Sequence, residues 1–146
     1  MRPTVLLTGG FGNLGGRVAS ALHLTGNWNI RLASRTHLSP PAWAPDATVV
    51  NLDLLNPDQV DIACSGVTSI IHLAALNDRQ AAADPNLAEA ISGAGTKLLT
   101  DAAAKHKVDR FIFMSTAHVY GSPLQGTVTE KTLTTNSHPY ATSHLS

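Results

Sequence analysis

Short runs of apolar residues alternate along the chain with segments in which apolar residues recur every three or four positions. The short runs predict five strands, at residues 4–8, 29–33, 48–52, 69–73 and 110–115. Between the first two runs, Leu14, Val18 and Leu22 repeat at a spacing of four, which predicts a helix with one apolar face. Strands that alternate with helices are typical of a parallel sheet covered on both faces, so we expect an α/β fold.

Residues that favour helix ends lie between these runs. Gly26 follows the first helix and suits the left-handed conformation that closes many helices. Asn56 before Pro57 predicts one helix start, with Asn56 as the cap. Asp84 before Pro85 predicts the start of the longest helix. These signals put helices after the third and fourth strands.

The composition is that of an ordinary globular chain, with 146 residues of which 43% are hydrophobic and 14% charged. No linker or repeat divides it, so we expect residues 1–146 to form one domain. Ten basic residues balance ten acidic ones, which argues against nucleic acid or a membrane surface as a partner. No apolar run approaches a membrane span of about 18 residues, and the apolar start is too short for a signal peptide, so we expect a cytoplasmic protein.

Metal and thiol chemistry find little support in the sequence. Cys64 is the single cysteine, which excludes an internal disulfide and favours a buried or half-buried structural thiol. His72 and His118 lie far apart and lack the spacing of metal ligands. We therefore expect no metal site.

A glycine-rich turn between the first strand and the first helix is the main candidate binding site. Gly9, Gly12 and Gly15 have the G-x-x-G-x-x-G spacing, and Phe11, Asn13 and Leu14 fill the positions between them. Glycines allow a tight turn and a close approach of backbone to a pyrophosphate, which the helix N-terminus then binds through free N–H groups. The turn therefore predicts dinucleotide binding; the alternative is a glycine-rich turn without a ligand.

The same turn resembles the T-G-x-x-G-x-x-G motif of the extended short-chain dehydrogenases/reductases, the epimerase/dehydratase group. Four further segments resemble that family's motifs in the same order: Asp53-Leu54, His72-Leu73-Ala74-Ala75, Gly95-Thr96-Lys97-Leu98-Leu99 and Ser115-Thr116-Ala117-His118-Val119-Tyr120-Gly121. The resemblance implies that Asp53 and Leu54 lie against the adenine of the cofactor. It also implies that Leu73, Ala74 and Ala75 lie beside the cofactor.

The fold implied is a doubly wound parallel sheet, a Rossmann fold, with strand order 3-2-1-4-5 and the cofactor over the C-terminal ends of the first and fourth strands. Family members continue into a sixth strand and a C-terminal substrate-binding region, so we expect residues 1–146 to be incomplete at the C-terminal end. The run from Phe111 to Met114 has no polar alternation and predicts burial on both faces. Without a sixth strand, the same run would be an exposed sheet edge, unless a partner chain covers it.

The end of the second strand bears on the choice of nicotinamide cofactor. NAD-binding folds usually have an acidic residue there that binds the ribose 2′-hydroxyl. Here Ser34 and Arg35 follow instead, and a guanidinium can pair with a 2′-phosphate. We therefore expect NADP, with NAD as the alternative if Arg35 is only a solvated loop residue.

The resemblance also implies catalytic residues: a Ser or Thr, a Tyr, and a Lys four residues after the Tyr. Thr116 and Tyr140 match the first two, and His144 stands at the Lys position. A histidine is shorter than a lysine and mostly neutral above about pH 6.5, so we expect Tyr140 to be less efficient or active at lower pH. The His144 substitution is one departure from the family's pattern. Ser92 is a second, because it stands where the family commonly has an Asn that orders a water.

The function expected is an NAD(P)-dependent oxidoreductase or epimerase/dehydratase that transfers hydride at a hydroxyl or keto carbon of a small molecule, such as a nucleotide sugar. The alternatives are a catalytically impaired NAD(P)-binding sensor or interaction module, and an inactive fragment. The resemblance further implies a homodimer. The substrate and the direction of the reaction do not follow from these residues.

Overall fold

The computed structural model describes residues 2–36 and 39–146, and these form two compact units. Unit 1 comprises Met1–Ala74 and Lys97–Met114, and unit 2 comprises Ala75–Thr96 and Ser115–Ser146. All five strands of the structure fall in unit 1. Among the helices that the structure describes, we find none with both the length and the apolar character needed to cross a membrane.

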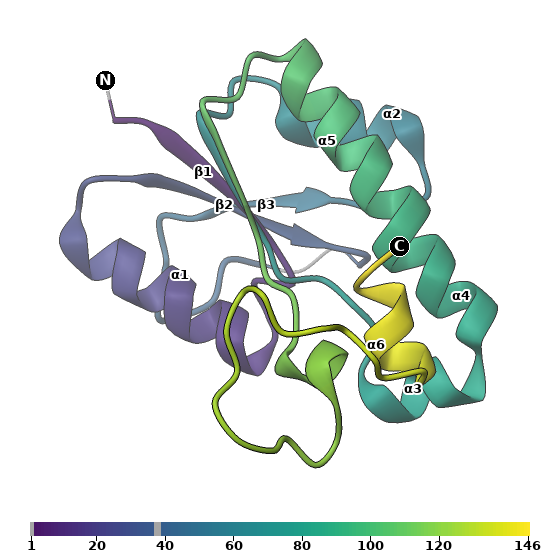
Figure 1. Cartoon of the computed structure of the whole chain (residues 1–146). Coiled ribbons are helices and arrows are strands. Elements are labelled where there is room, and N and C mark those ends of the chain that lie inside the picture. The colour runs from purple at the N-terminus through teal and green to yellow at the C-terminus, as the bar shows by residue number, and fades with distance from the viewer. Residues whose placement is uncertain (1, 37–38) are drawn as a thin grey trace. The chain divides into compact units, whose positions relative to one another are not determined.

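Unit 1 is built on a five-stranded parallel sheet (Figure 1). The strands are β1 (Thr4–Thr8), β2 (Asn29–Ser34), β3 (Thr48–Asn51), β4 (Ser69–His72) and β5 (Arg110–Phe113). Their order is β3-β2-β1-β4-β5, which confirms the doubly wound fold predicted from the sequence. In the central register, Leu6 lies opposite Arg31 of β2 and Ile70 of β4.

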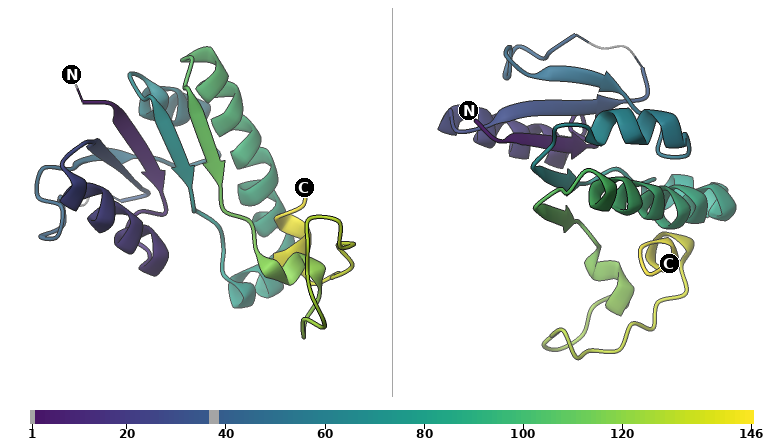
Figure 2. Two further views of the ribbon diagram at one scale, coloured as in Figure 1. Left: turned by 60° about the vertical axis from the view of Figure 1, so that its left-hand side comes forward. Right: turned by 90° about the horizontal axis from the view of Figure 1, so that it is seen from above.

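The helices of this fold are α1 (Asn13–Thr25), α2 (Pro57–Cys64) and α5 (Thr96–Lys105). Figure 2 shows α1 on one side of the sheet and α2 and α5 on the other, as right-handed crossovers require when the strand order reverses at β1 and β4. Two of the predicted helix signals are confirmed in unit 1: Gly26 closes α1 at φ 63°, and the Asn56 side chain accepts from the N–H groups that open α2.

The core of unit 1 lies around β1, because this strand has a neighbour on each side and helices over both faces. Leu6, Leu7, Leu32 and Ile70 are completely buried there. Cys64 is also fully buried, as predicted, and burial raises the pKa of its thiol to about 11. A thiol of that kind contributes packing rather than reactivity.

The prediction that the fifth strand is buried on both faces is wrong. Ile112, Phe113 and the following Met114 are 43%, 38% and 44% exposed. The physical reason is position, because β5 pairs with β4 on one side only and forms an edge of the sheet. The alternative expectation of an exposed apolar edge is the one the structure confirms.

Unit 2 contains short helical elements: α3 (Asp78–Ala83), α4 (Pro85–Glu89), the π-helical turn η1 (Ala90–Gly95), the 3₁₀ turn η2 (Ala117–Tyr120) and α6 (Pro139–Ser143). The predicted start of the longest helical segment is confirmed, since Asp84 caps α4 and Pro85 follows it. The sequence reasoning missed α3. Its signal was available, because Asn77 and Gln80 form a capping box at its start.

Candidate cofactor and catalytic sites

The glycine turn of unit 1 packs so closely that side chains would not fit. Gly9 has φ +70°, and a methyl group on it would lie 2.9 Å from the Ala74 nitrogen and the Leu73 carbonyl carbon. A methyl group on Gly15 would collide with the backbone of Gly9 and Gly10. The turn therefore brings backbone of β1, β4 and the start of α1 into contact, as the dinucleotide motif requires.

The N-terminus of α1 has donors without a side-chain acceptor. Its cap is Gly12, which forms no side-chain hydrogen bond, and no acidic residue lies in the first turn. The first N–H groups of a helix have no partner within the helix, so those of Asn13, Leu14 and Gly15 remain available to an anion. In contrast, α2, α3 and α4 are each capped by a side chain, from Asn56, Asn77 and Asp84. This start fits the pyrophosphate of a dinucleotide.

A threonine–histidine contact joins the ends of β1 and β4. Thr8 Oγ1 accepts hydrogen bonds from the N–H groups of Leu73 and Ala74, each at 3.2 Å. Its own proton is then donated to His72 Nδ1, 2.5 Å away, which assigns the ring nitrogen as the acceptor. Thr8 and His72 are both buried, so the contact fixes the two strand ends between which a Rossmann fold binds its ligand.

Ser34 ends β2, and the exposed Arg35 follows it. The Ser34 hydroxyl accepts from the Thr36 N–H at 3.2 Å and lies 3.4 Å from the Thr36 hydroxyl. No salt bridge to Arg35 is formed among the described residues. Two hydroxyls and a guanidinium therefore follow the strand at the position where an acidic residue is usual in NAD-binding folds.

Asp53 and Leu54 lie after β3, in the turn that leads to α2. One oxygen of the exposed Asp53 carboxylate accepts from the Leu55 N–H at 2.9 Å, and the Asp53 N–H donates to the Gln59 side chain at 2.7 Å. Leu54 is buried. The local bonds occupy one of the two carboxylate oxygens, and the second is left for other contacts. Leu73 and Ala74 belong to unit 1, whereas Ala75 belongs to unit 2.

Unit 2 contains all three candidate catalytic residues. Thr116 caps η2, and its hydroxyl oxygen accepts from the His118 N–H at 3.2 Å, which leaves the hydroxyl proton for another acceptor. Tyr140 lies in α6, and η2 and α6 contact each other. The His144 ring is buried and lies against the Tyr140 ring, with centroids 4.6 Å apart. His144 Nδ1 donates to the Tyr140 carbonyl at 2.8 Å, because a carbonyl can only accept.

Three residues important to these sites were missed from sequence. Thr8 was read only as part of the glycine motif, and its bond to His72 joins positions 64 residues apart. The His138 side chain caps α6, and Asn136 bonds to both η2 and the start of α6. Histidine is not among the preferred capping residues, so no sequence signal indicated this role.

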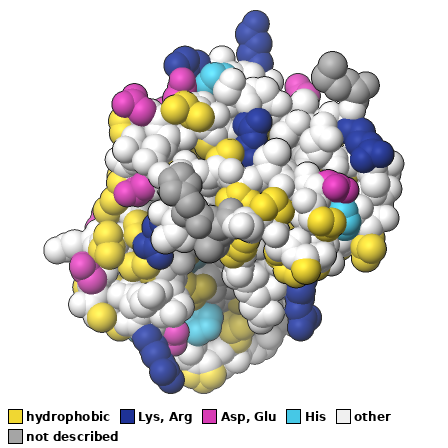
Figure 3. All heavy atoms as spheres, turned by 180° about the vertical axis from the view of Figure 1, so that it is seen from behind, with side chains coloured by type: hydrophobic (Ala, Val, Ile, Leu, Met, Phe, Trp, Pro, Cys, Tyr) yellow, Lys and Arg dark blue, Asp and Glu magenta, His cyan; other side chains and the backbone are white. Residues whose placement is uncertain are grey.

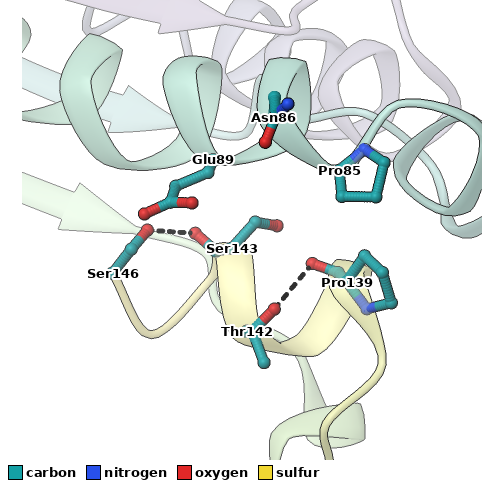
Figure 4. Close-up of a pocket in the computed structure, with 7 residues that line it drawn as sticks. All are labelled: Pro85, Asn86, Glu89, Pro139, Thr142, Ser143 and Ser146. Atoms are coloured by element: carbon teal, nitrogen blue, oxygen red, sulfur yellow. Dashed lines mark hydrogen bonds between the residues drawn. The ribbon is translucent and has the colours of Figure 1, made fainter.

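Unit 2 also contains a buried serine hydroxyl and a small cavity. The Ser92 hydroxyl is buried in the π turn and has no hydrogen-bond partner among the described residues. A cavity of about 180 Å³ lies between α4 and α6, lined by polar side chains such as Asn86, Glu89 and Thr142 (Figure 4). None of Thr116, Tyr140 and His144 lines this cavity.

The parallel sheet, the glycine turn and the uncapped helix start together define a Rossmann-type dinucleotide-binding fold. Residues 5–146 match the NAD dependent epimerase/dehydratase family, and the chain belongs to this family. The resemblance inferred from the motifs is thereby confirmed.

Individual relatives agree with this assignment. The dTDP-glucose 4,6-dehydratase of Streptomyces niveus is 32% identical over 110 residues, which are 72% of this chain and 32% of that protein. A short-chain dehydrogenase/reductase superfamily protein from Agrobacterium tumefaciens with bound NAD has a TM-score of 0.83 at 28% identity, covering 97% of this chain and 42% of the other. The UDP-glucose 4-epimerase from Bifidobacterium longum, in complex with NAD+ and UDP, has a TM-score of 0.82 at 27% identity, covering 97% and 46%. The chain therefore spans about a third of the dehydratase and less than half of each structure.

Proposed function

We propose that this chain provides the NAD(P)-binding part of an enzyme that acts by hydride transfer at a hydroxyl or keto carbon of a small molecule, such as a nucleotide sugar. The observation that carries the proposal is the uncapped glycine start of α1 at the end of β1. The names of the relatives, a dTDP-glucose dehydratase and a UDP-glucose epimerase, support a nucleotide sugar as the substrate class. When bound, the nicotinamide accepts or donates the hydride.

The residues of unit 1 would hold the cofactor. The N–H groups of Asn13, Leu14 and Gly15 would bind the pyrophosphate, with Gly9 and Gly12 allowing its close approach. Phe11 is exposed in the same turn. Asp53 and Leu54 would contact the adenine, and Leu73 and Ala74 the cofactor beyond the end of β4.

We propose NADP as the preferred cofactor because Arg35 and Ser34 replace the usual acidic residue. The two solved structures described above contain NAD, so NAD is the alternative. Calorimetric titration of the chain with NADPH and with NADH tests the choice. We expect NADPH to bind about tenfold more tightly, the effect of one charged contact of about 1.4 kcal/mol.

Arg35→Asp should reverse this preference, because a carboxylate repels a 2′-phosphate and accepts from a 2′-hydroxyl. Arg35→Gln is the matched control, which removes the charge without adding a new one and should only equalise the two affinities. If NADPH binding survived Arg35→Asp unchanged, the assignment of Arg35 would be wrong.

In the proposed reaction, Thr116 orients the substrate oxygen and Tyr140 transfers a proton to or from it. A free phenol has a pKa near 10, so a nearby cation is needed to favour its ionised form at neutral pH. His144 is the candidate for that charge when protonated, and its ring already lies against the ring of Tyr140. We therefore expect turnover to be higher on the acidic side of neutrality, where the imidazole is charged.

A second candidate function is NAD(P) binding without catalysis, in a sensor or interaction module. It is favoured by His144, whose Nδ1 donates to the backbone of its own helix where a lysine would offer a permanent charge. His144→Lys separates the two candidates, measured on a protein that also contains the substrate-binding region. A strong rise in turnover favours a weakened enzyme, whereas background turnover with the cofactor bound favours the module.

A further inference from the structure

Tyr140 lies within a closed set of contacts formed by two segments of unit 2. The Asn136 side chain donates to the His118 carbonyl at 2.8 Å and accepts from the His138 N–H at 3.0 Å. The His138 side chain in turn accepts from the Tyr140 N–H at 3.2 Å. The Tyr140 ring packs edge to face against the His118 ring, with ring centroids 5.7 Å apart and an interplanar angle of 82°, which closes the set of contacts. Three histidines, His118, His138 and His144, therefore surround one tyrosine.

The cap formed by His138 requires a neutral imidazole. Pro139 has no N–H group, so the N–H of Tyr140 is the first donor of α6. A backbone N–H can only donate, so Nδ1 of His138 must have a free lone pair, and the ring proton lies on Nε2. Protonation of Nδ1 removes the acceptor. It also puts a positive charge at a helix N-terminus, where the helix dipole disfavours it.

Protonation has a different effect on His144, which lies at the C-terminal end of α6. Nδ1 of His144 donates to the Tyr140 carbonyl, which is possible in both the neutral and the protonated form. A positive charge at this C-terminal position is favourable to the helix dipole. Acidification therefore leaves the bond of His144 intact and removes the bond of His138.

We propose that His138 is a positioning residue that holds Tyr140 only while its imidazole is neutral, so that mild acid releases the start of α6. The inference rests on the proposed function in one respect, because it regulates Tyr140 as the proton-transferring residue. The cap is present above the range in which histidines gain a proton, about pH 5 to 8, and is lost as the pH falls through it. Protonation of His144 would supply a positive charge beside Tyr140, whereas protonation of His138 would release the start of α6, so the two histidines would affect Tyr140 in opposite ways.

Other charged and titratable groups belong to the elements that contact α6. On η2 and α3 they are His118, Tyr120, Asp78 and Arg79; on α4 and its cap they are Glu89 and Asp84; and on α6 itself they are Tyr140 and His144. Histidine is the side chain that ordinarily changes charge between about pH 5 and 8. The test must therefore separate His138 from His118 and His144.

The experiment is an NMR measurement of amide exchange with water between pH 5 and 8.5, corrected for base catalysis, on the whole chain and on His138→Asn. In the parent chain we expect protection of the Tyr140 amide to fall about fivefold on acidification, the usual effect of a lost N-cap. Asparagine is an acceptor at every pH, so protection in His138→Asn should stay constant. The Gln59 amide, which donates to Asn56, is the internal control and should not respond.

His138→Ser is the second variant, which keeps a pH-independent acceptor in a smaller side chain. A Tyr140 amide that does not respond to pH in the parent chain would overturn the proposal. The same response in His138→Asn and His138→Ser as in the parent would also overturn it, because the cause would then be His118 or His144.

A second measurement is the pH at which kcat falls on the acidic side of the pH profile (the acid limb). A cap with a purely structural role would leave this pH unchanged. In a protein with the proposed activity, kcat of His138→Asn, expressed relative to its own value at neutral pH, should persist to lower pH than kcat of the parent protein. If the amide responds as expected and no variant turns over substrate, the proposed function fails while the cap stands. If turnover is present and its acid limb is identical in His138→Asn, the cap does not regulate the site.

Discussion

Two helix starts in this chain have opposite chemistry. Helix α1 begins at Gly12 without a side-chain cap, whereas α6 begins at His138, whose side chain accepts from the first available N–H. A side-chain cap is worth about 1 kcal/mol to a helix, so α1 forgoes stability that its sequence could have supplied. The difference shows that a helix start can serve a ligand or serve its own helix, and that the capping residue decides between them.

The packing around the two starts differs as well. At α1, three glycines bring backbone against backbone, and Thr8 ties the neighbouring strand ends together through His72. At α6, side chains make the contacts, through Asn136, His138 and the rings around Tyr140. The first region is fixed mainly by contacts between backbone atoms, whereas the second depends on side chains, three of which are histidines.

The largest expected effect follows from removing the close backbone contact at α1. In Gly15→Ala, the added methyl group would lie 2.8 Å from Gly10 Cα and collide with Gly9, so the turn must open. We expect a loss of roughly 3 kcal/mol in the free energy of unfolding and no detectable cofactor binding. Denaturant unfolding and calorimetry measure both.

Gly26→Ala is the matched control for this change, because Gly26 has φ +63° and nothing within 4 Å of an added methyl group. It should cost about 1 kcal/mol for the left-handed conformation and leave binding unchanged. Equal effects of the two substitutions would mean that close packing at Gly15 is unimportant.

The next effect comes from the contact between strand ends. Thr8→Val keeps the shape of the side chain but removes the hydroxyl bonded to His72 and to two backbone N–H groups. Leaving buried polar groups without that partner should cost about 2 kcal/mol, measured by denaturant unfolding. Thr8→Ser keeps the hydroxyl and should recover most of the loss; no difference between the two variants would contradict the role assigned to Thr8.

The smallest expected effect comes from a substitution that gives α1 a side-chain cap, and so tests the comparison between the starts of α1 and α6 directly. In Gly12→Asp, the carboxylate would accept from the free N–H groups and repel a pyrophosphate. We expect cofactor affinity to fall by about tenfold or more, about 1.4 kcal/mol, while stability changes by less than about 1 kcal/mol. The new cap would stabilise α1, but the close contact of the new Cβ with the Gly9 oxygen, at 3.2 Å, would offset part of that stabilisation.

Gly12→Ser separates charge from capping, since it adds a hydroxyl acceptor without a negative charge. Its loss of affinity should be smaller than that of Gly12→Asp. If affinity were unchanged in both variants, the N-terminus of α1 would not be the phosphate-binding group.

The parts of the fold that follow from local pattern could be predicted from the sequence. The apolar runs located all five strands, and the spacing of Gly9, Gly12 and Gly15 located the turn, because both depend on neighbouring residues. Basic and acidic side chains are interspersed over the face shown in Figure 3, which agrees with the balanced composition. Burial of β5 could not be predicted in the same way, since it depends on what lies beside the strand.

The contacts that organise the candidate sites depend on residues distant in sequence or on unusual chemistry. Thr8 and His72 are 64 residues apart, and Asn136 reaches His118 across 18. The cap of α6 uses a histidine, which propensity would not select. The order of the strands could be read from pattern, whereas the side-chain network around Tyr140 needed three-dimensional geometry.

The buried cysteine gives this protein a built-in reporter. Cys64 is the single thiol of the chain, is fully buried at the end of α2, and has a pKa raised to about 11 by burial. A thiol-specific reagent can therefore react only in molecules where that region has opened. The labelling rate, divided by the rate for a free thiol, gives the population of the open form without any added probe.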